Sequence, residues 1–98
     1  MEPAEVGEKL EVIRTYDAPG INPVGIFCDG ENIWTGDSHT GRIYRHKRDD
    51  RLSVGSVFIT PDFIQLSSID GDEDYLWICS ERGAKVYKYH KKLLEPLE

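Results

Sequence analysis

The stretch that decides the fold is CDGENIWTGDSHTGRIYRHKR, at residues 28–48, because a related stretch, DEDYLWICSERGAKVYKYHKK, returns at residues 72–92. The copies are 43 residues apart, and identical residues at that spacing include Ile26 and Ile69, Asp29 and Asp72, Trp34 and Trp77, and Tyr44 and Tyr87. A period in the forties with several strands in each unit is typical of a β-propeller blade. A single blade has two apolar faces, so it needs a neighbour on each.

Short β-rich segments separated by Gly, Pro and Asp dominate the chain, and no window has helical spacing of apolar residues over three turns. Eight strands are expected: Leu10–Tyr16, Val24–Cys28, Asn32–Gly36, Arg42–Lys47, Ser53–Ile59, Leu66–Asp70, Tyr75–Ser80 and Lys85–His90. The sequence therefore predicts an all-β protein with two propeller blades in each chain, each blade an antiparallel four-stranded sheet. The alternative is an ordinary β-sandwich or barrel, which eight strands would also fit.

The length of 98 residues favours a single domain. The expected divisions are one domain over 1–98, a first repeat at 10–53, a second repeat at 54–92 and a tail at 93–98. Within the second repeat, the run YLWIC at Tyr75–Cys79 is apolar on both faces, as a strand covered by two neighbouring blades must be.

Charge and composition exclude several classes of partner. Twelve Lys and Arg face eighteen Asp and Glu, so the net charge of −6 argues against nucleic acid or an anionic membrane as a partner. No segment approaches the roughly 18 apolar residues that span a bilayer, and the acidic N-terminus has no apolar region typical of a secretory signal. Cys28 and Cys79 form no CxxC pair and no metal-ligand spacing. We expect two buried, reduced thiols in a cytoplasmic protein.

The segment NPVGIFCDGENIWTGDSHTGRIYRH, at residues 22–46, resembles the blade repeat of propellers related to the NHL, SMP-30/gluconolactonase and virginiamycin B lyase families. The matching positions are Pro23, Gly25, Ile26, Asp29, Gly30, Trp34, Asp37, Ser38, Gly41, Ile43 and Arg45. The second copy departs from this pattern, since Ser80 and Glu81 stand where the first copy has Asp37 and Ser38. The resemblance implies that the second blade lacks its outer strand and that Leu10–Tyr16 is a spare outer strand.

The resemblance also implies that four loops share a ligand-binding face: Ala18–Asn22, Asp37–Gly41, Thr60–Gln65 and Ser80–Gly83. The candidate ligand-binding residues there are Asn22, Asp37, Ser38, His39, Glu81 and Arg82. Asp37, Ser38 and His39 have the residue types of a catalytic triad, but adjacent positions give poor triad geometry. The alternative is a tight turn in which Asp37 and Ser38 bind backbone amides and Gly41 supplies a positive φ. No residue is assigned a catalytic role.

Other residues that could carry chemistry favour structural roles. The motif DGDED, at residues 70–74, begins like an EF-hand loop, but its Gly is misplaced and the bidentate Glu is missing. We therefore expect an acidic hairpin turn, with no metal and no cofactor. Trp34 and Trp77 suit packing between blades better than a sugar-binding platform. His46 and His90 are expected to be exposed at strand ends.

Together these features favour a non-enzymatic, ligand-binding or scaffolding propeller that binds a small molecule or peptide. Two blades cannot close a ring of roughly four to eight, so we expect a homo-oligomer, with a trimer favoured and a tetramer possible. Leu10–Tyr16 would pair with Lys85–His90 of the neighbouring chain. The alternatives are a small hydrolase or lyase of lactonase type with an axial site, and a fragment of a longer propeller. The acidic metal ligand of such a lactonase is missing, since Gly25 and Ile26 stand in its place.

Overall fold

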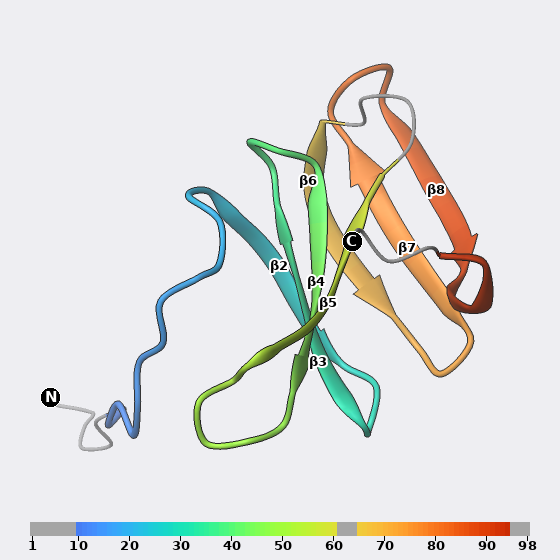
Figure 1. Cartoon of the computed structure of the whole chain (residues 1–98). Helices are drawn as coiled ribbons and strands as arrows, with labels where there is room; N and C mark the ends of the chain where they lie inside the picture. Colours follow the sequence, from blue (N-terminus) through green and yellow to red (C-terminus); the bar gives the residue numbers. More distant parts are fainter. Residues whose placement is uncertain (1–9, 61–64, 95–98) are drawn as a thin grey trace, which may run out of the picture.

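The computed structural model of this chain describes residues 10–60 and 65–94 (Figure 1). The described strands form two antiparallel sheets. The first sheet contains, in spatial order, β2 (Pro23–Cys28), β3 (Asn32–Asp37), β4 (Arg42–Lys47) and β5 (Val54–Ile59). The second contains β6 (Leu66–Gly71), β7 (Tyr75–Ser80) and β8 (Lys85–His90), and the 3-10 helix η2 (Lys91–Leu93) follows.

The all-β prediction is confirmed, and seven of the eight expected strands lie within one residue of their predicted ends. Among the residues described, no helix has the length and apolar character needed to cross a membrane. Three predicted segments fall wholly or partly outside the description: the N-terminal residues 1–9, residues 61–64 of the loop that begins at Thr60, and residues 95–98 of the tail.

The sequence repeat is also a structural repeat. Each strand of the second sheet begins and ends 43 residues after its counterpart in the first, so that β6, β7 and β8 correspond to β2, β3 and β4. Both hairpins are closed in the same way, because Asp29 and Asp72 each accept hydrogen bonds from the backbone amides two and three residues further on. The strand β5 pairs with β4, so the first sheet extends beyond Ser53, where the first repeat was expected to end.

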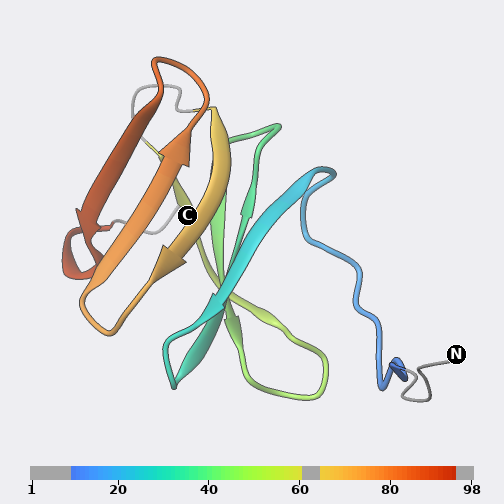
Figure 2. The same cartoon turned by 180° about the vertical axis from the view of Figure 1, so that it is seen from behind.

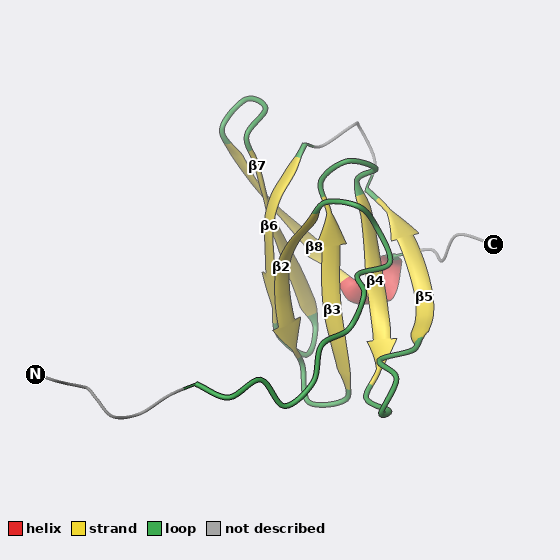
Figure 3. Ribbon diagram, turned by 90° about the vertical axis from the view of Figure 1, so that its left-hand side faces the viewer, coloured by secondary structure: helices red, strands yellow, loops and turns green. Residues whose placement is uncertain are grey.

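The prediction of a strand at Leu10–Tyr16 is wrong for the single chain. This segment is extended but pairs with no strand, and it runs outside the first sheet on the side away from the second (Figures 1 and 3). Leu10 and Ile13 are almost fully exposed, at 101% and 98%. A strand exists only where its backbone hydrogen-bonds to another strand, and neither sheet of its own chain receives this segment.

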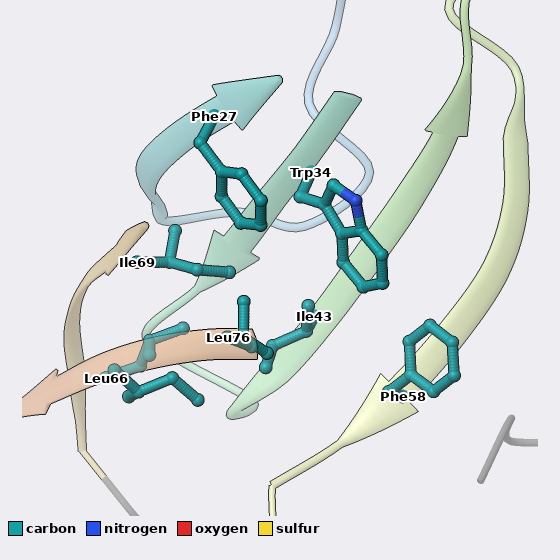
Figure 4. Close-up of a cluster of buried hydrophobic side chains, with 8 residues drawn as sticks. Phe27, Trp34, Ile43, Phe58, Leu66, Ile69 and Leu76 are labelled. Atoms are coloured by element: carbon teal, nitrogen blue, oxygen red, sulfur yellow. The ribbon is translucent and has the colours of Figure 1, made fainter. Parts of the chain in front are cut away.

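The two sheets pack face to face and come closest at their first strands, β2 and β6 (Figure 2). Large side chains from both sheets point into the space between them (Figure 4). They are Phe27, Trp34, Ile43, Phe58, Leu66, Ile69, Leu76 and Ile78. Trp34 stacks on both Phe27 and Phe58, with ring centroids 5.8 Å and 5.7 Å away. The burial of Trp34 agrees with its predicted packing role.

Two glycines permit the close approach of the sheets. A Cβ atom at Gly71 would lie 2.7 Å from Cζ of Phe27, and one at Gly36 would overlap the side chain of Leu66. Any larger residue at either position would force the sheets apart.

Each sheet has an outer face that points away from the other sheet, because side chains alternate along a strand. The outer face of the first sheet carries Pro23, Ile26, Cys28, Ile33, Thr35, Tyr44, His46 and Ile59. Tyr44 and His46 are buried there, whereas the strand β2 is open. The outer face of the second sheet carries Ser68, Asp70, Trp77, Cys79, Val86 and Lys88. Ile26 is 65% exposed, Trp77 is 40% exposed and Val86 is 65% exposed. The predicted burial of both cysteines is wrong, since Cys28 and Cys79 occupy these outward positions and are exposed.

Candidate functional site

The turns at residues 38–41 and 81–84 join β3 to β4 and β7 to β8, and both lie at the upper end of the molecule in Figure 1. This is the end where the six candidate ligand-binding residues were expected to gather. The structure places Asn22, Asp37, Ser38 and His39 at the first turn, and Glu81 and Arg82 at the second.

Asp37 is buried and organises the first turn. Its Oδ1 accepts a hydrogen bond from the backbone amide of Asn22 (2.7 Å), and its Oδ2 accepts from the amide (3.0 Å) and hydroxyl (2.7 Å) of Thr40. The amide of Gly41 donates to the Asp37 carbonyl, and Gly41 has a φ of 71°. The geometry is that of the tight turn, and the carboxylate is fully engaged in holding it.

The electrostatics of Asp37 follow from these contacts. Burial alone raises the pKa of Asp37, but the hydrogen bonds from Thr40 and Asn22 and the nearby charge of His39 lower it by more, so the pKa lies below its usual value. Asp37 is therefore ionised at neutral pH and serves as an acceptor for backbone amides rather than as an acid.

Asn22 and Ser38 also belong to this turn. The side-chain amide of Asn22 donates to Oγ of Ser38, and the Ser38 amide donates to the Asn22 carbonyl over 3.0 Å. His39 is exposed on the same turn. The hydroxyl of Ser38 thus contacts Asn22, and its geometry is not that of a nucleophile activated by His39.

The second turn repeats the first with fewer contacts. Ser80 is buried in the position of Asp37, and its Oγ accepts a hydrogen bond from the Arg82 amide over 3.1 Å. The Glu81 amide donates to the carbonyl of Gln65, as the amide of its counterpart in the first turn does to Asn22. Glu81 and Arg82 themselves are exposed. Within the described ranges, no interaction links their side chains to the first turn.

His46 is one of two structural residues that the sequence did not identify. It was expected to be exposed, but it is only 1% exposed. Its Nδ1 lies 3.0 Å from the Leu52 carbonyl and its Nε2 lies 2.8 Å from the Thr35 hydroxyl. A carbonyl only accepts, so Nδ1 donates to it. This bond holds the β4–β5 loop where Leu52 has a φ of 54°. The prediction failed because the loop folds back over the strand end.

The other such residue is Lys91, which lies at the lower end and joins the sheets. Its Nζ lies 2.7 Å from Oδ2 of Asp29, which also accepts a hydrogen bond from Trp34 Nε1 over 2.9 Å. Nζ of Lys91 also donates to the Asp72 carbonyl. Burial alone raises the pKa of Asp29, but Lys91 and the other donors lower it far below its usual value. No local signal could have revealed this pair, since Asp29 and Lys91 are 62 residues apart in the sequence.

A shallow pocket of about 290 Å³ lies beside this ion pair and is lined by Asp29, Glu31, Glu73 and Asp74. Lys91 already neutralises Asp29 there. Nearby, Asp72 accepts its two backbone amides as a hairpin turn does, in agreement with the expectation for DGDED. Over residues 10–60 and 65–94, no group of three or more His, Cys, Asp or Glu is arranged to hold a metal ion.

A scan against protein-family models, a search of curated proteins and a search of solved structures each found no match. The resemblance to NHL, SMP-30 and virginiamycin B lyase blades therefore stays a prediction.

Proposed function

We propose that this chain is a two-blade unit of a homo-oligomeric β-propeller that acts as a scaffold or ligand-binding protein and not as an enzyme. One observation carries the proposal: residues that one sheet buries in the core have counterparts, 43 residues away, on the outward face of the other sheet. Trp34 and Ile43 are buried, and their counterparts Trp77 and Val86 lie exposed. Ile69 is buried, and its counterpart Ile26 lies exposed.

The two outer faces are unlike each other, and together they form the same pair of surfaces that meet inside the chain. A second copy can therefore dock head to tail, and repetition of such a contact closes a ring when the rotation allows it. The wedge shape supports a ring, because the sheets come closest at β2 and β6 and diverge toward β5 and β8 (Figure 1). Left uncovered, Ile26, Trp77 and Val86 would favour aggregation.

The chemistry of the loop end supports binding or scaffolding over catalysis. Asp37 and Ser38 are engaged in their own turn, whereas His39, Glu81 and Arg82 are exposed. A ring would repeat these three side chains around its axis, where they could converge on one small molecule or peptide.

Native mass spectrometry tests the assembly. We expect a mass three times that of the 11.2 kDa chain, and a tetramer would also support a ring. Val86→Asp should dissociate the oligomer, because it places a charge in the covered face. Val86→Ile is the matched control and should leave the mass unchanged. A wild-type chain that stays monomeric would contradict the proposal.

A further inference from the structure

We propose that the outer face of the second sheet docks on the outer face of the first sheet of a second copy in the register that the two sheets keep within one chain. This inference rests on the proposed head-to-tail assembly and specifies its contacts. Arg48 of the second copy then takes the place of Lys91 and pairs with Asp72. Cys79 lies against Pro23 of the second copy.

The ion pair follows from the repeat. Lys91 binds Asp29 across the two sheets and also the carbonyl of Asp72 in its own sheet. Its counterpart 43 residues earlier is Arg48, which donates to the carbonyl of Gly30 in its own sheet over 3.1 Å. The two cations therefore hold equivalent places beside equivalent hairpins. Lys91 pairs with the carboxylate of Asp29 in its own chain. The counterpart of Asp29 is Asp72, so the proposed partner of Arg48 is Asp72 of another copy.

The contacts between the two sheets of one chain also have counterparts between two copies. Inside the chain, Gly36 lies against Leu66 and Gly71 lies against Phe27. The corresponding pairs between copies are Cys79 with Pro23, and Cys28 with Asp70. In both pairs the glycine becomes a cysteine while the large partner becomes a smaller residue. Close packing tolerates such an exchange of volume, because the space between the sheets stays filled without overlap.

A charge at Asp70 also fits this register. Inside the chain, Lys91 lies over the Phe27 ring, with Nζ 5.9 Å from the centroid. Between copies the equivalent contact is Arg48 with Asp70, so the aromatic ring is replaced by a carboxylate that can pair with the cation. The remaining glycine contact between the sheets, Gly25 on Ile69, becomes Ser68 on Ile26. A Cβ atom at Gly25 would lie 2.7 Å from the backbone nitrogen of Ile69, so the two copies must lie slightly further apart at Ser68 than the two sheets do at Gly25.

One contact of the buried face of the first sheet recurs on the outer face of the second sheet. Arg45 lies over the Trp34 ring, with Cζ 5.8 Å from the centroid, and its counterpart Lys88 lies over Trp77, with Nζ 5.1 Å away. A second copy would therefore meet a surface arranged like the one that the second sheet meets within the chain.

Disulfide trapping tests the register, since the chain has only two cysteines. The Pro23→Cys, Cys28→Ser variant places one thiol on each outer face, and the Pro23→Cys, Cys79→Ser control places both thiols on one face. After oxidation with copper phenanthroline and oxygen, a non-reducing gel of the first variant should show covalent dimers and a covalent trimer or tetramer, reversed by reductant. The control should run as a single chain on the same gel, because both of its thiols lie on one face. Position 23 begins a strand, and circular dichroism would verify that both variants fold.

A charge pair tests the same register without a disulfide. Arg48→Glu should raise the dissociation constant of the oligomer at least about tenfold, which is about 1.4 kcal/mol, whereas Arg48→Lys should keep it within about twofold, since Lys91 fills the equivalent place. Equal changes in the dissociation constant for the two variants would contradict the proposed ion pair between Arg48 and Asp72.

The outcomes separate the two proposals. If the wild-type chain is an oligomer by native mass spectrometry but the opposed thiols do not crosslink, or the control crosslinks equally well, the register is wrong and the proposed assembly stands. A monomeric wild-type chain overturns both.

Discussion

His46 and His39 lie close in sequence but differ completely in environment. His46 is enclosed and bonds to the Leu52 carbonyl and the Thr35 hydroxyl, whereas His39 projects from an exposed turn. The residue type is the same, and the difference arises from the loop that folds over the end of β4. A histidine in this chain is therefore structural or available to a ligand according to its position.

This difference predicts unequal effects on stability. His46→Ala should lower the free energy of unfolding by about 1–3 kcal/mol, because it leaves the Leu52 carbonyl and the Thr35 hydroxyl without their partner. His39→Ala should change it by less than about 0.5 kcal/mol, as expected for an exposed site. Urea denaturation of both variants would measure this. Similar losses for the two would contradict the structural role of His46.

Among the described strands, β8 lies at the edge of a three-stranded sheet, whereas its counterpart β4 is paired with β5. An uncovered edge presents unpaired backbone groups that can accept another strand. The chain also has an extended segment, Leu10–Tyr16, that is paired with none of the described strands and contacts the β4–β5 loop through a hydrogen bond from Arg14 to the Asp50 carbonyl. The two features complement each other, and we predict that this segment of one copy supplies the fourth strand beside β8 of the next.

Deletion of residues 1–17 tests the strand exchange. Light scattering should show that the full chain is a trimer and that the truncated chain has lost the trimer or precipitates, because the edge of β8 is left open. Deletion of residues 1–9 is the matched control and should leave the trimer intact, since it keeps Leu10–Tyr16. An intact trimer after removal of residues 1–17 would rule out the exchange while leaving the packing of the outer faces untouched.

Over the whole molecule, as far as residues 10–60 and 65–94 show it, the two sheets are joined by their shared apolar core and by the ion pair between Asp29 and Lys91. Asp29 belongs to the first hairpin and Lys91 follows the last strand, so the pair links segments 62 residues apart. Trp34 contributes to the same contact through its indole N–H. Loss of this contact is therefore expected to affect the stability of the whole fold and not of one hairpin.

The lowered pKa of Asp29 predicts how stability depends on pH. A carboxylate whose pKa is lower in the folded state contributes stability above its unfolded pKa, near 3.8, and loses it as the pH falls toward the folded value. Asp29→Asn should lower the free energy of unfolding by about 1–3 kcal/mol at pH 7, since it removes the ion pair with Lys91. The difference in the free energy of unfolding between wild type and variant should narrow progressively below about pH 4.

Denaturant titrations at several pH values would measure this gap. Glu73→Gln, at an exposed carboxylate near the same pocket, should show no comparable gap at any pH. A gap for Asp29→Asn that does not change with pH would contradict the assignment of the stability to the charged pair.

Local sequence patterns were sufficient to predict the seven strands of the two sheets, their hairpins and the repeat. Asp29 and Asp72 close their hairpins through amides two and three residues away, and Gly41 forms its turn with Asp37. Such features depend on residues that are close along the chain, so local patterns predict them. The tight turn at Asp37 was foreseen for the same reason.

Which face of each sheet is covered depends on how the two sheets pack and could not be predicted from local patterns. Alternation shows that a strand has two faces, but it does not tell which one meets a neighbour, and so Cys28 and Cys79 proved exposed and Trp77 uncovered. The same holds for the enclosure of His46 and for the pairing of Lys91 with Asp29. These contacts join segments that are distant in sequence, and the free energy that selects them arises only when the two sheets pack together.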